Sequence, residues 1–349
     1  MEKVFSIANG LPPSLTPPDN QSYVVVGGVT TDENGITWIA DRTPPGDTAL
    51  VTVRPDETLG YVTGFATRSP YVTFTDIVID FNRTKWFTNF GRFEPSHENR
   101  STGLYYYNEN AILPGGGAHW GKLIQQDGLT SENIYSLAVD RDGALWIGTD
   151  NGITIMFDPS NPRGSILPYH PLQQSTQLIQ AIVVDPLNNK WIGTKQGVFL
   201  YSADGTVILD HYTVSNTDGK LLDDDIASIA INPSAGTVYF GTEKGLSSLS
   251  TYAVSPTRSF EELRFSPNPF YLPSSATLTV SGLVQGSTLK ILSIDGALVR
   301  EIQTPGGGVG FWDGKDLRGA LASTGVYIVV GYSEDGTKVA TGKIAVIRR

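Results

Sequence analysis

An aromatic residue recurs through the first 250 positions at a nearly constant spacing, and this repeat constrains the fold more than any other feature. The separations along the chain are 48, 60, 45 and 48 residues. A period of about 45–50 residues is typical of four-stranded propeller blades. The repeats therefore predict a β-propeller with at least five blades. The recurring residues are Trp38, Trp86, Trp146, Trp191 and Tyr239.

Each repeat also divides into short strands and turns. The fourth repeat holds four apolar or alternating runs, at residues 181–185, 190–194, 198–201 and 207–212. Between them lie Gly, Asn, Asp and Pro residues, which favour turns. The recurring aromatic residue has the same mid-strand place in every repeat. We therefore predict that it packs between neighbouring blades and does not bind a ligand.

The pattern changes after Tyr252. A polar joint containing proline, residues 253–262, leads into a segment of short strand-like runs, and seven such runs within about 90 residues predict an antiparallel β-sandwich. The sequence thus predicts an all-β chain of two domains, a propeller over residues 1–254 and an immunoglobulin-like sandwich over residues 260–349. The runs are residues 263–265, 276–280, 288–294, 297–303, 309–313, 326–332 and 337–347.

The long spacing before Trp146 indicates an insertion at about residues 91–121. An insertion that interrupts a repeat is a candidate functional loop, because binding residues collect on loops carried by a rigid scaffold. We therefore predict ligand binding by five ring-bearing side chains in this segment. They are Tyr105, Tyr106, Tyr107, His119 and Trp120.

Composition and charge argue against several functions. The formal net charge is −10, and no basic run is present that could neutralise a nucleic-acid backbone. The chain has no cysteine, which excludes disulfides and thiolate-bound zinc. Its four histidines lack metal-binding spacing, and its paired carboxylates lie in predicted turns. We expect no metal, no cofactor, no catalytic residue and, without 18 consecutive apolar residues, no transmembrane helix.

The repeat resembles a known one. Residues 142–153 combine an Asp-Gly turn, the run Leu-Trp-Ile-Gly-Thr and a Gly-led apolar strand. This pattern is similar to that of the two-component regulator propeller repeats, and the resemblance extends over about residues 24–250. It implies a fold and leaves the function open.

The C-terminal segment carries five short motifs in order, ending at the last residues. Together they resemble the C-terminal domain that directs proteins of Bacteroidetes to the type IX secretion system. Such a domain acts after export, so the resemblance implies a protein at the cell surface or outer membrane. We expect that a signal peptide, absent before Met1, has been removed or precedes this sequence. The residues that carry the resemblance include Pro267, Asn268, Pro269, Trp312, Gly325, Val326, Tyr327 and Lys343.

A propeller of this class followed directly by this domain is similar to the C-terminal part of the PorZ family of type IX surface components. The resemblance implies a non-enzymatic scaffold of the attachment complex. Its implied partners are other attachment-complex proteins, including the sortase, and anionic lipopolysaccharide. The nearest cationic residues for such a ligand are Lys290, Arg300, Lys315 and Arg318.

Two alternatives remain open. The chain could be a secreted propeller cargo, either an adhesin or an enzyme acting on polysaccharide. Its C-terminal domain would then be a sorting signal, cleaved near residues 253–262. It could also be the sensor part of a hybrid two-component receptor, since the propeller repeat often has that role.

Overall fold

The computed structural model describes residues 4–13, 24–41, 48, 50–64, 74–89, 102–110, 119–169, 177–256, 259–260, 262–273, 277–304 and 308–348. The regular secondary structure of these residues is almost entirely β-strand, with three short 3-10 helices at Ile7–Asn9, Gln125–Asp127 and Pro162–Gly164. No helix in these ranges has the length and hydropathy needed to cross a membrane. The chain forms two compact units. One comprises residues 1–184, 190–229 and 241–245, and the other comprises residues 185–189, 230–240 and 246–349.

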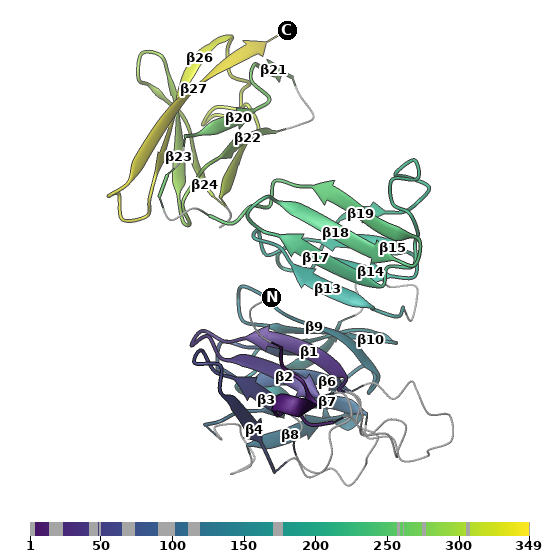
Figure 1. Ribbon diagram of the computed structural model, residues 1–349. Helices are drawn as coiled ribbons and strands as arrows, with labels where there is room; N and C mark the ends of the chain where they lie inside the picture. The colour runs from purple at the N-terminus through teal and green to yellow at the C-terminus, as the bar shows by residue number, and fades with distance from the viewer. Residues whose placement is uncertain are drawn as a thin grey trace. The chain divides into compact units, whose positions relative to one another are not determined.

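Four antiparallel sheets of four strands each make up most of the first unit (Figure 1). Within each sheet, strands that follow one another in the chain lie side by side. The first strands of successive sheets also contact one another, from β1 to β5, β9 and β13. This arrangement is the propeller-like fold that the repeat predicts, and we refer to the sheets as blades 1 to 4.

The strands of blades 1 and 2 are β1 (Val26–Thr31), β2 (Thr37–Asp41), β3 (Leu50–Val53), β4 (Leu59–Val62), β5 (Phe74–Ile79), β6 (Lys85–Asn89), β7 (Gly103–Tyr107) and β8 (Trp120–Leu123). Those of blades 3 and 4 are β9 (Ile134–Val139), β10 (Leu145–Thr149), β11 (Gly152–Met156), β12 (Ile166–Tyr169), β13 (Ala181–Val184), β14 (Lys190–Thr194), β15 (Gly197–Tyr201) and β16 (Ile208–Tyr212). The four strands predicted for the fourth repeat are all present.

The fifth repeat forms a smaller sheet, blade 5. It consists of β17 (Ser228–Asn232), β18 (Thr237–Thr242) and β19 (Gly245–Ser250) in that order. The strand β18 carries Tyr239, the fifth recurring aromatic residue. Among the described residues, blade 5 has no fourth strand.

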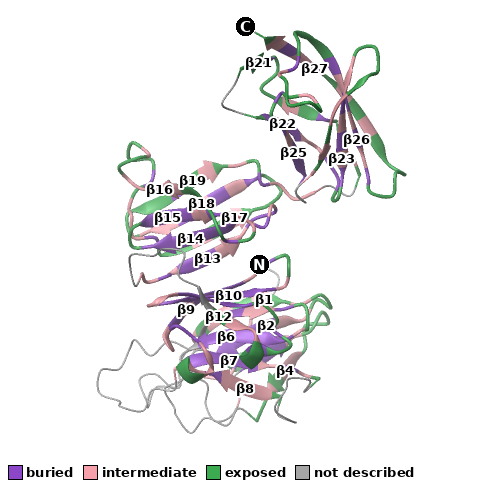
Figure 2. Cartoon of the chain, turned by 180° about the vertical axis from the view of Figure 1, so that it is seen from behind, coloured by how far each residue is buried: buried purple, intermediate pink, exposed green. Residues whose placement is uncertain are grey.

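The four recurring tryptophans are buried, and Trp38, Trp86 and Trp146 pack between neighbouring blades, as predicted. Trp38, Trp86, Trp146 and Trp191 are each at most 2% exposed, and Figure 2 shows the middle strands of these blades as largely buried. Trp38 of blade 1 packs in one cluster with side chains of β5, β6 and β7 in blade 2. Trp86 and Trp146 make the equivalent contacts with blades 3 and 4. Tyr239 differs, since its side chain is partly exposed.

Two further sheets in the second unit pack around one hydrophobic core, which draws side chains from both. They form a β-sandwich. The seven predicted strands are present, together with a short eighth strand that pairs parallel to the last one. The domain limits and the immunoglobulin-like topology stay predictions. One sheet is β20 (Arg264–Ser266), β22 (Leu278–Ser281) and β25 (Val309–Trp312), and the other is β21 (Phe270–Leu272), β27 (Val339–Arg348), β26 (Gly325–Tyr332), β23 (Thr288–Ser293) and β24 (Leu298–Gln303).

The predicted insertion at residues 91–121 contains regular parts of blade 2. Residues 103–107 are the strand β7, whose Tyr106 lies opposite Trp86 of β6, and Trp120 opens β8. These residues therefore continue the repeat. Residues 91–101 and 111–118, with Gly115 to Gly117, lie outside the described ranges.

Candidate functional site

An aspartate six residues before the recurring tryptophan organises the turn between the first two strands of a blade. In blade 3, Asp140 Oδ1 accepts the backbone N–H groups of Asp142 and Ala144 at 3.0 and 2.9 Å. Its Oδ2 accepts the indole N–H of Trp146. One carboxylate thus holds both the turn and the buried ring. The aspartate–indole distances in blades 1, 2 and 3 are 3.0 Å for Asp32–Trp38, 2.8 Å for Asp80–Trp86 and 2.9 Å for Asp140–Trp146.

Two fully buried lysines lie at the borders between blades. Lys85 Nζ lies 3.9 Å from the centre of the Trp38 ring and 2.8 Å from the Glu109 carboxylate. Burial lowers the pKa of Lys85, although its pairing with Glu109 and the nearby Asp32 oppose this shift. An ammonium over an aromatic face is favourable even where water is excluded. The lysine therefore links blade 2 to blade 1.

The second lysine has the same place in the repeat. Lys190 Nζ lies 3.1 Å from Asp140 Oδ2 and 4.9 Å from the centre of the Trp146 ring, and it also donates to the carbonyl of Ala203. Both lysines directly precede the tryptophan of their own blade. The sequence analysis missed this feature, although the dipeptide Lys-Trp and the aspartate six residues before the tryptophan were visible signals.

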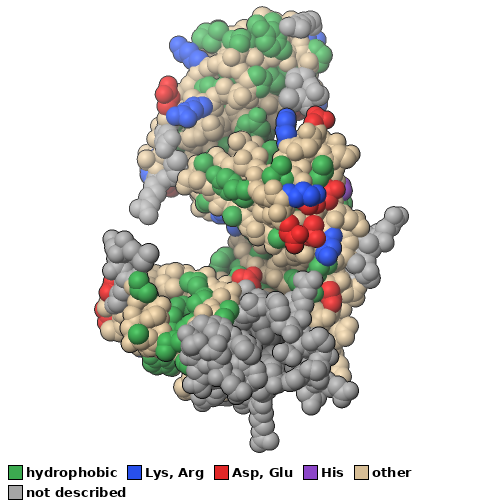
Figure 3. Space-filling model, turned by 45° about the vertical axis from the view of Figure 1, so that its right-hand side comes forward, with side chains coloured by type: hydrophobic (Ala, Val, Ile, Leu, Met, Phe, Trp, Pro, Cys, Tyr) green, Lys and Arg blue, Asp and Glu red, His purple; other side chains and the backbone are tan. Residues whose placement is uncertain are grey.

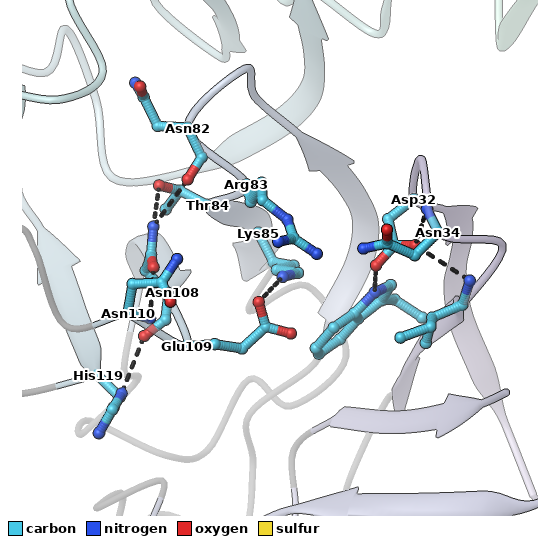
Figure 4. A network of polar contacts seen from close by, with 12 residues as sticks. Asp32, Asn34, Asn82, Arg83, Thr84, Lys85, Asn108, Glu109, Asn110 and His119 are labelled. Atoms are coloured by element: carbon cyan, nitrogen blue, oxygen red, sulfur yellow. Dashed lines mark hydrogen bonds and ion pairs between the residues drawn. The ribbon is translucent and has the colours of Figure 1, made fainter.

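Around Lys85, side chains from two turns of blade 2 form a polar network (Figure 4). Asn108 Nδ2 donates to Thr84 Oγ1 at 2.9 Å and to the carbonyl of Asn82 at 3.1 Å. His119 Nδ1 donates to the carbonyl of Asn108 at 3.0 Å. The network thereby fixes the turn between β5 and β6 against the connection from β7 to β8.

The structure separates the five predicted ligand-binding residues into two groups. Tyr105 and Tyr106 are 3% and 6% exposed, and they pack in the clusters on opposite sides of blade 2. Their burial is at odds with ligand contact. Tyr107 and Trp120 are partly exposed, with ring centres 4.7 Å apart, and His119 is exposed beside Tyr107 at 6.2 Å. We call Tyr107, His119 and Trp120 the blade 2 aromatic surface.

Polar groups accompany this aromatic surface. Glu109 and Asn110 lie two and three residues after Tyr107, and they are partly exposed and exposed, respectively. Burial raises the pKa of the Tyr107 hydroxyl, and the nearby Glu109 carboxylate raises it further, so this hydroxyl stays a neutral donor. Trp120 Nε1 donates to the carbonyl of Thr63 in blade 1 at 3.0 Å, which fixes the orientation of its ring.

No group of three or more His, Asp and Glu side chains in the described part of the chain is placed to hold a metal ion. The aspartates at 223–225 illustrate the reason. Lys244 pairs with Asp223 at 2.9 Å, and Gln180 donates to Asp225 at 2.7 Å. Asp224 accepts the backbone N–H of Val214. Each of the three carboxylates therefore already has a hydrogen-bonding or ion-pair partner within the protein. His97 and His170 lie outside the described residues.

Most of the predicted sorting motif has a structural place in the sandwich. Trp312 is fully buried, donates to the carbonyl of Lys315 at 2.9 Å, and lies 5.7 Å from the Tyr327 ring. Asn268 Oδ1 accepts the N–H of Ala345 in β27 at 3.2 Å, between two prolines, Pro267 and Pro269, that follow cis peptide bonds. These contacts serve the fold.

The remaining residues of that motif lie in the last two strands. Gly325 opens β26, and Val326 and Lys343 are exposed. Val326 lies opposite Ala345 and Ile328 lies opposite Lys343, so the two exposed side chains share one face of the five-stranded sheet. This face is where the motif reaches the surface.

Comparison with known proteins agrees with the fold. The family described as two component regulator propeller matches residues 128–151, which hold β9, β10 and the Asp140–Trp146 pair. No curated protein matches the chain. The structure is similar to that of PorZ, described as an essential surface component of the type IX secretion system of Porphyromonas gingivalis. The identity is 24%, the match covers 93% of this chain and 45% of PorZ, and the TM-score is 0.58.

Comparison with other solved structures gives weaker similarities. The extracellular domain of a hybrid two-component system from B. thetaiotaomicron matches 94% of this chain and 45% of its own, with 14% identity and a TM-score of 0.50. A gluconolactonase from Xanthomonas campestris covers 64% of this chain and 71% of its own, at 15% identity and a TM-score of 0.42, which is too low to bear on activity. The chain spans less than half the length of the first two proteins. At these identities, the similarity defines a propeller-like all-β protein.

Proposed function

We propose that the protein is a non-enzymatic cell-surface scaffold of the type IX secretion system, with the role that PorZ has in its own organism. The observation that carries this proposal is the match to PorZ over 93% of the chain. A match of that extent includes both the blades and the C-terminal sandwich. Outer-membrane location, the attachment-complex partners and the sortase follow from the same comparison as parts of the proposal.

The joint before the sandwich supports a domain that is retained. Ser255 N–H donates to the carbonyl of Pro233, in the turn between β17 and β18, at 2.7 Å. Gly308 N–H in the sandwich donates to the carbonyl of Val254 at 2.9 Å, and Ala253 is buried. A protease needs an accessible, extended segment. Cleavage at residues 253–255 would first require these hydrogen bonds to open, which supports retention of the sandwich at this part of the joint.

We propose that lipopolysaccharide contacts the blade 2 aromatic surface. We assign no role in this contact to the cationic residues of the sandwich. In the sandwich, Lys290 lies 3.9 Å from Glu301, and Lys315 lies 3.8 Å from Asp313. On the face in Figure 3, acidic and basic side chains of the described residues are interspersed. Sugar rings, in contrast, suit Tyr107 and His119, whose apolar faces and polar edges lie together.

Two measurements test the proposal. The first uses protein recovered from the outer surface of its native cells. One sample, without cross-linking, gives the intact mass, and a second, cross-linked sample identifies the captured partners. A mass that includes residues 260–349, together with captured attachment-complex proteins, is expected. A mass ending near residue 255 would overturn the scaffold role and favour the cargo alternative.

The second measurement is binding of anionic lipopolysaccharide to the immobilised protein. Tyr107→Ala is expected to weaken binding at least tenfold. The matched control is Tyr271→Ala, which removes an exposed tyrosine from the sandwich and should leave binding unchanged. Equal lipopolysaccharide affinities of the two variants would show that the ligand does not bind at the blade 2 aromatic surface.

A sensor role is the second candidate function. The observations favouring it are the repeat match at residues 128–151 and the similarity to the extracellular domain from B. thetaiotaomicron. The cross-linking experiment distinguishes the two functions, because a sensor would be recovered with a histidine kinase and a scaffold with type IX components.

A further inference from the structure

Within the described residues, blade 5 lacks an element that the other blades have. In blades 1 to 4, a fourth strand pairs with the third and forms the outer edge of the sheet. In blade 5, β19 is the third strand, and no described strand pairs with its outer side. The repeat thus leaves one defined strand position unfilled within the described residues.

The backbone of β19 offers hydrogen-bonding groups at this edge. Thr251 N–H donates to the carbonyl of Gly236 at 2.7 Å, which sets the register of the β18–β19 hairpin. In an antiparallel pair, bonded residues alternate with residues whose N–H and C=O groups point away from the partner strand. The register therefore directs the backbone groups of Leu246, Ser248 and Ser250 outward. All three residues are exposed, and Leu246 is 66% exposed.

This edge also lacks the features that prevent strand pairing. Exposed edges are usually protected by charged residues, proline or bulges. The six residues of β19, Gly-Leu-Ser-Ser-Leu-Ser, contain neither charge nor proline. Three of the four outermost strands of the other blades do carry such a residue, namely Lys122 in β8, Pro168 in β12 and Asp210 in β16. Among the outermost strands of the described part of the chain, β4 of blade 1 and β19 of blade 5 lack such a residue, but β4 is itself the fourth strand of its blade, whereas β19 is the third of its own.

We propose that the outer edge of β19 binds an extended segment of a partner protein, which adds to blade 5 as its fourth strand. The fourth strands of blades 1 to 4 indicate what fits. Each has four or five residues and begins with a large apolar side chain, Leu59, Trp120, Ile166 or Ile208. Main-chain hydrogen bonds supply the affinity in such additions, and alternate side chains supply the specificity. This proposal is independent of the type IX function.

A peptide-binding experiment on the full chain tests the proposal. The probe is a fluorescein-labelled peptide with the sequence of residues 206–213, which contains the fourth strand of blade 4. Saturable binding is expected by fluorescence anisotropy. The amide hydrogens of Leu246, Ser248 and Ser250 should exchange at least tenfold more slowly with bound peptide. A scrambled peptide should produce neither effect.

A pair of substitutions at one position separates edge pairing from other modes of binding. Ser248→Pro removes an outward N–H that β18 does not use, so the hairpin is retained and strand addition is blocked. Ser248→Thr keeps the N–H and should bind the probe as the parent does. If Ser248→Pro does not fold, Leu246→Lys places a charge on the same edge. Equal binding by the blocked variant and Ser248→Thr would overturn the proposal.

Two other outcomes would also overturn it. Slow exchange of the three amides in the monomer without peptide would mean that the chain itself covers the edge. Protection that grows with protein concentration, together with a doubled mass, would mean that a second copy occupies it.

Discussion

The border between blades 1 and 2 is closed by a lysine, whereas the border between blades 2 and 3 is closed by a leucine. Lys85 and Leu145 each precede the tryptophan of their own blade, and both are fully buried. Lys85 lies over Trp38, whereas Leu145 packs in one cluster with Trp86. One position of the repeat therefore accepts either an ammonium or an alkyl group. The repeat aspartate makes this possible, because its carboxylate lies beside the tryptophan that the next blade covers.

The two lysine borders also differ from each other. Lys85 is paired with Glu109, whose side chain is 34% exposed, while Lys190 is paired with Asp140, whose side chain is 5% exposed. Loss of the lysine leaves a carboxylate near water in the first case and a buried one in the second. An unpaired buried charge is far more costly than an unpaired exposed one. The border between blades 3 and 4 should therefore be the more sensitive of the two.

The largest effect is expected for Asp140→Ala. This substitution leaves Lys190 without its carboxylate and removes the acceptor for the N–H groups of Asp142, Ala144 and Trp146. The free energy of unfolding should fall by about 4 kcal/mol, as measured by urea denaturation with tryptophan fluorescence. Glu243→Ala, which removes an exposed carboxylate, is the control and should change it by less than about 0.5 kcal/mol. Similar losses for both would contradict the proposed role of Asp140.

The two lysines should respond differently to the same replacement. We expect Lys190→Met to cost about 3 kcal/mol and Lys85→Met about 1 kcal/mol, because methionine retains the alkyl packing and only the buried Asp140 is left uncompensated. The measurement is the same urea denaturation. A larger loss for Lys85→Met would show that exposure of the partner carboxylate does not govern these borders.

A third lysine border should be possible between blades 2 and 3. Leu145→Lys would place an ammonium group near Asp80, the repeat aspartate of blade 2. This pair would correspond to the ion pair between Lys190 and Asp140. A double-mutant cycle with Asp80→Asn should show a favourable coupling of about 1 kcal/mol between the new lysine and Asp80. Additive losses would mean that the aspartate and the position before the tryptophan are not in register at this border.

The smallest effects concern pH, and their signs should be opposite in blades 1 and 2. Burial raises the pKa of Asp80 above 3.8, against the hydrogen bond from Trp86. Burial also acts to raise the pKa of Asp32, but the hydrogen bonds from Trp38, Ile36 and Asn34 outweigh it and hold the pKa below 3.8. The contribution of Asp80 to the free energy of unfolding is therefore fully present below pH 3.8 and is lost as the pH rises through its folded pKa. The contribution of Asp32 is lost in the opposite direction, as the pH falls through its folded pKa.

Denaturation of Asp80→Asn and Asp32→Asn at pH 3 and pH 7 checks these signs. Asp80→Asn should lower the free energy of unfolding more at pH 3 than at pH 7. Asp32→Asn should lower it more at pH 7 than at pH 3. The same sign in both variants would mean that the two blades hold their aspartates in equivalent environments.

Much of the fold was predictable because it rests on regular spacing. The period of the aromatic residues predicted the blades, and alternation of apolar residues predicted seven strands of the sandwich. The strand β21 (Phe270–Leu272) was missed because Pro269 and Pro273 flank it directly, and prolines are typical of turns and loops. The tyrosines at 105–107 were interpreted as an inserted loop because the spacing before Trp146 is long. Structurally, they are a blade strand whose alternate side chains face different blades.

The sequence by itself determined features that depend on neighbours within a few positions. The aspartate turn and its bond to the tryptophan span seven residues, so spacing alone encodes them. Only the tertiary structure decided which polar groups lose contact with water. Lys85 is buried because blade 1 lies against it, and β19 is an open edge because no described strand pairs with its outer side. Burial depends on surfaces that come together from distant parts of the chain, and the local sequence pattern does not predict which distant surfaces meet.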